Sequence, residues 1–378
     1  MNLKFPIYSP YFNGREKALV IDCIDSTWIS SKGKYVGQFE DTFGAWLGAQ
    51  HAVTVSNGTV ALHLALAALG IGPGDEVLVP TLTYIASANA VKYTGADVVF
   101  VDSERDYWQI DIDDAERKIT DRTKAIMVVH LYGQTPDMDA VMALAKKHSL
   151  YVIEDCAEAI GTRYDDTHVG TFGDVGCFSF FGNKTITTGE GGMVVTNNAA
   201  LAQKIRHLRS QGVCSEREYW HDAIGFNYRM TNVCAAIGCA QMESVDDLIA
   251  KKRQIAEWYR QSLADLPVQV HATHPRTLHS YWMVSILVDD ARDRDALRTA
   301  LRVDGIETRP VFYPLHQMKM YAAPGQHFPI ANDISSRGIN LPSYPGLMRD
   351  DIAFICERVH DFFARQETRM EPLLETKS

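Results

Sequence analysis

One lysine stands in a setting that would make it a nucleophile. Lys184 follows an aromatic stretch and precedes a turn rich in threonine and glycine, in the run SFFGNKTITTGEGGM. Apolar surroundings disfavour an ammonium ion, so they lower the pKa of a lysine and free its amine for attack on a carbonyl. The glycines of this run let the backbone approach a ligand closely. The run therefore predicts a reactive amine rather than an ordinary surface lysine.

Three other segments place useful groups at the ends of expected strands. Asp155 ends the β-branched part of VIEDCAEAIG, at the carboxyl edge where open α/β sheets bind ligands. A carboxylate there can pair with a protonated ring nitrogen, although it is equally consistent with a helix N-cap. Gly58 and Thr59 of SNGT begin an expected helix, whose first amides can hold a phosphate. Tyr84 follows the strand that ends at Pro80, and it can offer its ring to a flat ligand.

Together these groups describe a ligand with an aldehyde, a cationic ring nitrogen, a flat ring and a phosphate. Pyridoxal 5′-phosphate has all four, and its known protein partners are a Schiff-base lysine and an acid at the ring nitrogen. The alternative for residues 182–185 is a nucleotide-binding P-loop. That pattern needs a glycine directly before the lysine, and Asn183 stands there instead. The residues therefore favour pyridoxal phosphate.

The elements that must position these residues alternate along the chain. Strands are expected at residues 52–56, 76–80, 97–101, 124–130, 150–154, 175–180 and 192–196, with a short one at 185–187. Helical stretches separate most of them, which is typical of an α/β fold with a mostly parallel sheet. A single long helix is expected from Thr231 to about Leu263, followed by a smaller α+β region. The expected divisions are an N-terminal segment at 1–25, which packs with the small lobe or a partner, a large cofactor-binding domain at 26–245, and a small domain at 246–378.

Composition excludes several classes of protein. The 378 residues are 46% hydrophobic and 22% charged, which is ordinary for a globular protein. The 37 basic and 47 acidic residues give a net charge of −10, which argues against nucleic acid as a partner. No apolar run is long enough for a membrane span, and the N-terminus does not resemble a signal peptide, so a cytoplasmic location is expected. Seven cysteines without a CxxC pair predict neither disulfides nor a metal site.

Seven motifs in order resemble the sugar aminotransferases of the DegT/DnrJ/EryC1/StrS family. They are SNGT, PTLTYIASANA, VHLYGQ, VIEDCAEAIG, FSFFGNKTITTGEGGM, GFNYRMTN and RPVFYPLH. The resemblance implies the aspartate-aminotransferase fold (fold type I) and dependence on pyridoxal phosphate. It also implies a homodimer whose two active sites are shared across the interface.

The resemblance assigns roles residue by residue. Lys184 would bind the cofactor aldehyde and move the proton, Asp155 would pair with the ring nitrogen, and Tyr84 would stack on the ring. Glu158 stands where many relatives have glutamine, near the ring hydroxyl. The phosphate would be held by Gly58, Thr59 and Ser179, with Asn183 close by and Asn227 reaching in from the neighbouring subunit. The sugar pocket would include Trp28, His130, Arg229, Arg309, Tyr313 and His316, each of which is equally consistent with a structural role.

The same resemblance implies that L-glutamate is the amino donor and a nucleotide-linked keto-deoxysugar the acceptor. The wording of SFFGNKTITTGEGGM, WISS and GFNYRMTN is most similar to members that aminate C4 of GDP-4-keto-6-deoxy-D-mannose, for O-antigen or other surface polysaccharides. A UDP- or dTDP-linked 3- or 4-keto sugar is the alternative acceptor. A non-catalytic sugar-nucleotide-binding protein on the same fold is a more distant alternative, disfavoured because Lys184 and Asp155 are both present. Dehydratases of the family carry histidine in place of the lysine, which disfavours dehydration.

Overall fold

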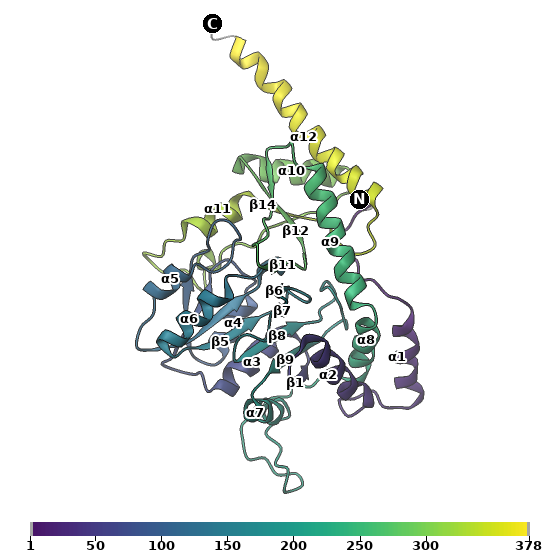
Figure 1. The fold of residues 1–378 in the computed structure, drawn as a ribbon, viewed down its shortest axis with the longest axis vertical. Helices are drawn as coiled ribbons and strands as arrows, with labels where there is room; N and C mark the ends of the chain where they lie inside the picture. The colour runs from purple at the N-terminus through teal and green to yellow at the C-terminus, as the bar shows by residue number, and fades with distance from the viewer. Residues whose placement is uncertain (1–2, 376–378) are drawn as a thin grey trace.

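A seven-stranded sheet forms the centre of the computed structural model, which describes residues 3–375 (Figure 1). Its strand order is β1-β9-β8-β5-β4-β2-β3. The strands are β1 (His51–Val55), β2 (Glu76–Pro80), β3 (Asp97–Val101), β4 (Thr123–Val129), β5 (Tyr151–Asp155), β8 (Val175–Ser179) and β9 (Gly192–Thr196). β9 runs antiparallel to both β1 and β8, and the other neighbours pair in parallel. The predicted α/β class and mostly parallel sheet are confirmed.

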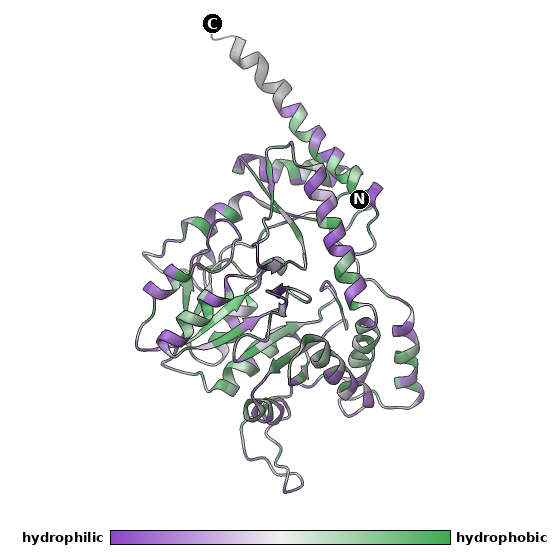
Figure 2. Ribbon diagram, in the orientation of Figure 1, coloured by the Kyte–Doolittle hydropathy of each residue, from purple (hydrophilic) through white to green (hydrophobic). Residues whose placement is uncertain are grey.

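Helices cover both faces of this sheet, because successive side chains of a strand point to opposite sides. Val53 and Val77 face one apolar core with α3 (Gly58–Leu69), while Ala52 and Leu78 face cores on the other side. The helices of this region are α1 (Arg15–Asp25), α2 (Lys34–Leu47), α4 (Ala86–Tyr93), α5 (Ile112–Arg117), α6 (Met138–His148), α7 (Ala199–Arg209) and α8 (Asn232–Met242). Figure 2 shows the hydrophobic residues gathered on the central strands and on the inner sides of the helices. This three-layer arrangement fixes the carboxyl ends of the parallel strands along one edge.

The predicted short strand at 185–187 is wrong, since those residues form a turn. The hydroxyl of Thr187 donates to the carbonyl of Phe180 at 3.1 Å, and the amide of Gly189 donates to that hydroxyl at 2.9 Å. These local hydrogen bonds take the place of a strand ladder. The turn is what carries Lys184 away from the sheet.

A second, antiparallel sheet of order β10-β12-β14-β13 follows in the chain. Its strands are β10 (Val268–Val270), β12 (Val284–Val288), β13 (Arg309–Pro310) and β14 (Gly338–Leu341), and its helices are α9 (Val245–Ser262), α10 (Ala291–Val303), α11 (Pro329–Arg337) and α12 (Arg349–Glu375). A small third sheet joins β6 (Arg163–Tyr164), β7 (Thr167–His168) and β11 (Thr277–Leu278). None of the helices within residues 3–375 is both long and apolar enough to cross a membrane.

The single helix predicted from Thr231 to Leu263 is also wrong. It is divided into α8 and α9, because the amides of Glu243 and Ser244 bond to carbonyls three residues back, at 3.2 and 3.1 Å. The side-chain Nδ2 of Asn13 donates to the Ser244 hydroxyl at 2.8 Å, so the N-terminal segment occupies the break. Asp246 and Asp247 then begin α9, where acidic side chains favour the positive end of the helix dipole.

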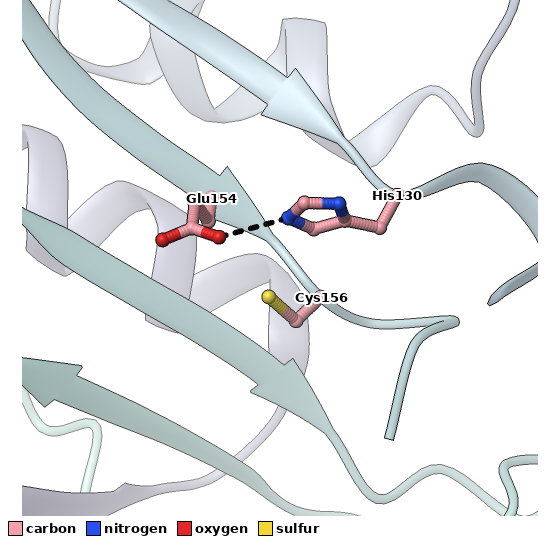
Figure 3. A group of neighbouring side chains, drawn as sticks. All are labelled: His130, Glu154 and Cys156. Carbon is pink, nitrogen blue, oxygen red and sulfur yellow. Dashed lines mark hydrogen bonds and ion pairs between the residues drawn. The ribbon is translucent and has the colours of Figure 1, made fainter. Parts of the chain in front are cut away.

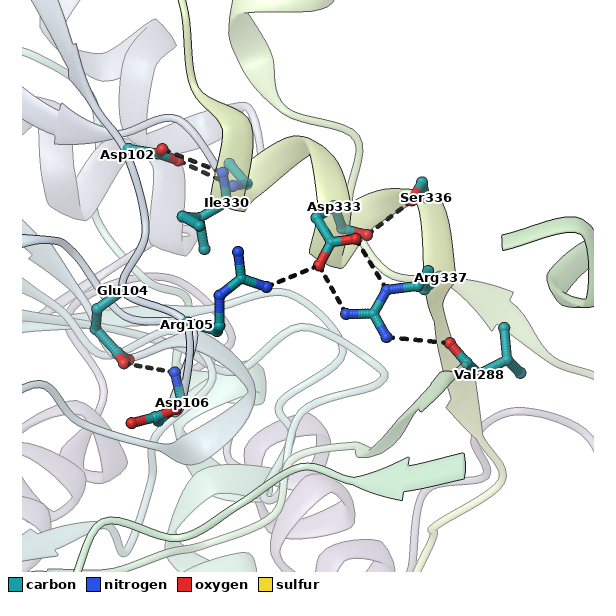
Figure 4. A network of polar contacts seen from close by, with 10 residues as sticks. Asp102, Glu104, Arg105, Asp106, Val288, Ile330, Asp333, Ser336 and Arg337 are labelled. Atoms are coloured by element: carbon teal, nitrogen blue, oxygen red, sulfur yellow. Dashed lines mark hydrogen bonds and ion pairs between the residues drawn. The ribbon is translucent and has the colours of Figure 1, made fainter. Parts of the chain in front are cut away.

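A polar network fixes the second sheet and its helices to the first (Figure 4). Asp102, just after β3, accepts hydrogen bonds from the amides of Ile330 and Ala331 at 3.2 and 2.9 Å. This carboxylate therefore caps the start of α11 from the other lobe. Arg105 reaches Asp333 of the same helix at 3.2 Å. These directional contacts fix the second lobe, which consists of the antiparallel sheet and its helices, relative to the carboxyl ends of the central strands.

His271, a buried histidine just after β10, is expected to make the fold sensitive to acid. The ring of His271 is stacked on Trp108 with centroids 3.9 Å apart, and Nε2 bonds to the carbonyl of Tyr107 at 2.9 Å. Burial lowers the pKa of His271 to about 4. A folded-state pKa below the unfolded value means that the contribution to stability is present above about pH 6.5 and is lost as pH falls toward 4. We expect His271 alone to cost about 2 kcal/mol of unfolding free energy between pH 7.5 and pH 5.

Urea unfolding of the full chain at both pH values checks this prediction. His271→Phe should show a smaller loss of stability on acidification than the wild type, because phenylalanine cannot take up the proton. The exposed His327 supplies a matched control, and His327→Phe should keep the wild-type difference. Equal pH dependence in all three proteins would contradict the assignment.

Candidate active site

Lys184 lies in a tight turn just beyond β8. Its amide donates to the carbonyl of Phe181 at 2.9 Å, and its Nζ lies 3.9 Å from the centre of the Trp282 ring. Burial lowers the pKa of the Lys184 ammonium, and the carboxylates of Glu158 and Asp155 oppose that shift. Burial beside an aromatic ring therefore favours the neutral, nucleophilic amine, while the two nearby carboxylates favour the ammonium form and limit the shift.

Asp155 is the last residue of β5, and its carboxylate is fixed by two donors. The Ser87 hydroxyl donates at 2.8 Å and the Ala157 amide at 3.1 Å. Burial raises the pKa of Asp155, while these hydrogen bonds and the charge of Lys184 oppose the shift. Thr83 lies 3.1 Å from the same Ser87 hydroxyl and continues the network. The result is an oriented carboxylate at the edge of the sheet, suited to a cationic partner.

Glu158 is also buried, close enough to Lys184 for their charges to interact. Its carboxylate accepts the amide of Tyr132 at 2.9 Å, and burial raises its pKa, with the charge of Lys184 opposing. Tyr132 has a φ of 57°, a left-handed conformation that is uncommon for a residue other than glycine. Such strain is often kept at functional sites. Here it turns the Tyr132 amide toward Glu158.

The start of α3 makes a cradle next to the end of β8. The Asn57 side chain caps the helix by accepting the amide of Val60 at 3.0 Å. The first amides of a helix, here those of Gly58 and Thr59, have no acceptor within the helix and suit an anion. A Cβ atom at Gly58 would lie 2.7 Å from the Cβ of Ser179. Glycine is therefore needed at 58 for the helix start to approach Ser179.

A cavity of about 430 Å³ opens beside the lysine turn, between the two lobes. Four residues proposed from the sequence line it together: Tyr84, Asn183, Arg309 and Tyr313. The buried Oδ1 of Asn183 has no hydrogen-bond partner among the described residues. An unsatisfied polar atom next to a cavity is costly unless a ligand completes it. Trp282 and Phe312, which sequence reasoning missed, also line the cavity.

The two histidines proposed for the sugar pocket do not line the cavity. His316 is buried with Nδ1 2.7 Å from the Thr81 hydroxyl, which ties the second lobe to the end of β2. His130 is fully buried, with Nε2 3.0 Å from Glu154. Trp28 is exposed and does not line the cavity. The two histidines thus bond to residues of the protein core, and none of the three residues lines the cavity.

His130, Glu154 and Cys156 lie close enough to suggest a metal site (Figure 3). However, Glu154 already accepts hydrogen bonds from His130 and from the amides of three loop residues, at 2.7–3.0 Å. These are Gly170, Phe172 and Gly173. Four donors satisfy both carboxylate oxygens, so the cluster has a structural role in holding that loop against β5.

Asn227 and Arg229 form a pair outside the cavity. Oδ1 of Asn227 accepts from Nε and Nη2 of Arg229 at 3.2 and 2.9 Å. Their segment runs beside the end of β1, where the amide of Ser56 donates to the carbonyl of Tyr228 at 2.8 Å. The loop before it projects below α7 in Figure 1 and exposes Ile224. Both polar side chains are therefore near the start of α3 but outside the cavity.

Comparisons with known proteins agree over nearly the whole chain. The chain is 57% identical to a GDP-perosamine synthase of Escherichia coli O157:H7, over 95% of this chain and 98% of that one. It is 53% identical to a GDP-perosamine synthase of Vibrio cholerae, over 95% and 99%. The PLP-form structure of Spr1654, a putative sugar aminotransferase from Streptococcus pneumoniae, aligns with a TM-score of 0.91 at 26% identity, over 97% and 99%. Residues 10–360 match the family profile as well, and the chain belongs to the DegT/DnrJ/EryC1/StrS aminotransferase family.

Proposed function

We propose that this protein is a pyridoxal-phosphate-dependent aminotransferase that moves the amino group of L-glutamate to C4 of GDP-4-keto-6-deoxy-D-mannose, giving GDP-perosamine. The observation that carries the substrate assignment is the full-length similarity to two GDP-perosamine synthases, at 57% and 53% identity. The site supports the reaction type, because an amine with a lowered pKa interacts with two buried carboxylates and stands next to Asn183 of the cavity lining.

The residues present fit pyridoxal phosphate. Gly58, Thr59 and Ser179 offer an anion cradle that a Cβ atom at position 58 would fill. Asp155 offers an oriented carboxylate for the ring nitrogen, and the unpartnered Oδ1 of Asn183 offers an acceptor at the cavity. When bound, this cofactor supplies an aldehyde that binds amines and a ring that withdraws electrons.

The chain's own groups then have distinct tasks. Lys184 would hold the cofactor through its Nζ. Once released, the same Nζ would accept the proton that leaves the Cα atom of the amino donor. A lowered pKa favours the neutral amine, which is the form that accepts a proton. Asp155 would hold the ring nitrogen in its protonated form, and Tyr84, which lines the cavity, would offer its ring to stack on the cofactor. Glu158 supplies a second negative charge that balances Lys184 when it is protonated.

A homodimer belongs to the same proposal. Asn227 is exposed, and the loop that precedes it exposes Tyr219 by 91% and Ile224 by 95%. Large exposed apolar side chains on a projecting loop mark a contact surface. A second copy of the chain would cover this loop, and Asn227 would then reach the partner's phosphate cradle.

A panel of acceptors tests the substrate assignment. Purified protein with L-glutamate should convert GDP-4-keto-6-deoxy-D-mannose with a kcat/KM about 10²-fold above that for UDP- or dTDP-linked keto sugars. Lys184→Ala serves as the blank for each acceptor. A preference for a UDP- or dTDP-linked sugar would contradict the GDP assignment but keep the aminotransferase. Absence of turnover with every acceptor and of any glutamate-dependent spectral change would contradict both.

A further inference from the structure

Two side chains from outside the large sheet hold the backbone of the lysine turn. The indole Nε1 of Trp282 donates to the carbonyl of Asn183 at 2.7 Å. The phenol of Tyr8 donates to the next carbonyl along the chain, that of Lys184. Two consecutive carbonyls are thus engaged by residues that lie 99 and 176 positions away in the sequence.

Tyr8 is anchored on the second lobe. Phe5 forms a parallel bridge with Ile306, and the amide of Ile7 donates to Glu307 at 3.0 Å. The buried Nζ of Lys252 lies 5.6 Å from the centre of the Tyr8 ring. That nitrogen donates to the carbonyl of Ser343 at 2.8 Å, so the group beside the Tyr8 ring is itself held in place.

Trp282 is anchored on the same lobe, two residues before β12. Its amide donates to the carbonyl of Tyr132 at 3.0 Å, and its ring stacks with the Tyr132 ring at an interplanar angle of 9°. Trp282 is 95% buried, and the Lys184 Nζ lies over its ring, 3.9 Å from the ring centre. Trp282 therefore makes two contacts near Lys184. Its Nε1 bonds to the carbonyl of Asn183, the preceding residue, and its ring faces the Lys184 amine.

We propose that Tyr8 and Trp282 are positioning residues, which clamp the lysine turn so that the Lys184 amine faces the bound cofactor; this rests on the proposed function. The base of the turn is closed by the Thr188 amide on the carbonyl of Phe180, but within residues 182–186 the backbone bond is that of the Lys184 amide to Phe181. A flexible four-carbon side chain on a loose turn would lose the near-attack geometry. A misplacement of about 1 Å can cost about 10²-fold in rate.

The test follows bond formation in the cofactor-free, full-length protein. On addition of pyridoxal phosphate, the amine condenses with the aldehyde, one water leaves, and visible absorbance appears. We expect Tyr8→Phe and Trp282→Phe to form this bond about 10-fold more slowly than wild type. Tyr259→Phe is the matched control, because it also removes a buried phenol bonded to a backbone carbonyl, that of Pro342 at 2.9 Å. Its rate should equal the wild-type rate.

Pyridoxamine 5′-phosphate separates the lysine from the rest of the site, since it has no aldehyde for Lys184. Its affinity should stay within about twofold of wild type in Tyr8→Phe and Tyr259→Phe, whose side chains do not line the cavity. Bond formation as fast in Tyr8→Phe and Trp282→Phe as in Tyr259→Phe would overturn the clamp. So would a parallel loss of pyridoxamine phosphate affinity in Tyr8→Phe, which would mean that Tyr8 shapes the cofactor site instead. Failure of the wild type to bind either compound would contradict the proposed function itself.

Discussion

Lys184→Ala is expected to lose transamination by about 10³-fold or more and to lose the visible absorbance of the bound cofactor. In the proposed function, the amine of Lys184 makes the covalent bond and also moves the proton, so no neighbour would replace both actions. Lys252 is a fully buried lysine, and its Nζ donates to the carbonyl of Ser343 and does not line the cavity. Absorbance spectra and single-turnover kinetics with L-glutamate measure the two losses separately.

The control for this variant is binding rather than turnover. Pyridoxamine 5′-phosphate should still bind Lys184→Ala, because the α3 cradle and Asp155 are intact. Lys147→Ala, which removes an exposed lysine paired with Glu116, should behave as wild type in both assays. Retention of colour and turnover in Lys184→Ala would remove the lysine from the mechanism.

Asp155→Asn is expected to keep the covalent bond to the cofactor but to lose turnover by about 10²-fold or more. Asparagine has nearly the same shape and can still accept a hydrogen bond from Ser87 or Ala157, so the site should remain assembled. It carries no charge, however, and cannot keep a proton on the ring nitrogen. The visible absorbance should therefore form while proton removal from the donor slows.

Asp174→Asn is the matched control for Asp155→Asn. Asp174 lies just before β8, at the opposite edge of the sheet, and its carboxylate also accepts a backbone amide, that of Val152 at 2.8 Å. This variant should lose some stability but keep its kcat. Equal losses of kcat in the two variants would mean that the effect of Asp155→Asn is structural.

The core of the site was predictable because chain order and sheet topology fix it. Strands β1, β5 and β8 begin and end within one residue of their predicted bounds, and the sheet brings their carboxyl ends to one edge. Asp155, Gly58 and the lysine turn all follow directly from those strand ends. Short-range patterns of this kind are legible, since a buried parallel strand needs a nearly continuous apolar run.

The supporting residues could not be predicted in the same way. Ser87, Tyr8 and Trp282 act through contacts with residues far away in the sequence. Ser87 lies within the motif PTLTYIASANA, but the motif does not show that its hydroxyl meets Asp155. For His130 the motif predicted a sugar contact, whereas in the structure the ring is buried and its Nε2 bonds to the buried Glu154. Which polar residues pair inside a core depends on tertiary packing, which periodicity does not encode.

Nitrogen transfer is the most direct test of the central claim. The purified protein is incubated with ¹⁵N-labelled L-glutamate and GDP-4-keto-6-deoxy-D-mannose, and the sugar nucleotide is examined by NMR and mass spectrometry. The account predicts a GDP-linked 4-amino-4,6-dideoxy sugar with ¹⁵N on C4 and one 2-oxoglutarate per sugar formed. Label at another carbon, or formation of 2-oxoglutarate without a labelled sugar, would contradict it.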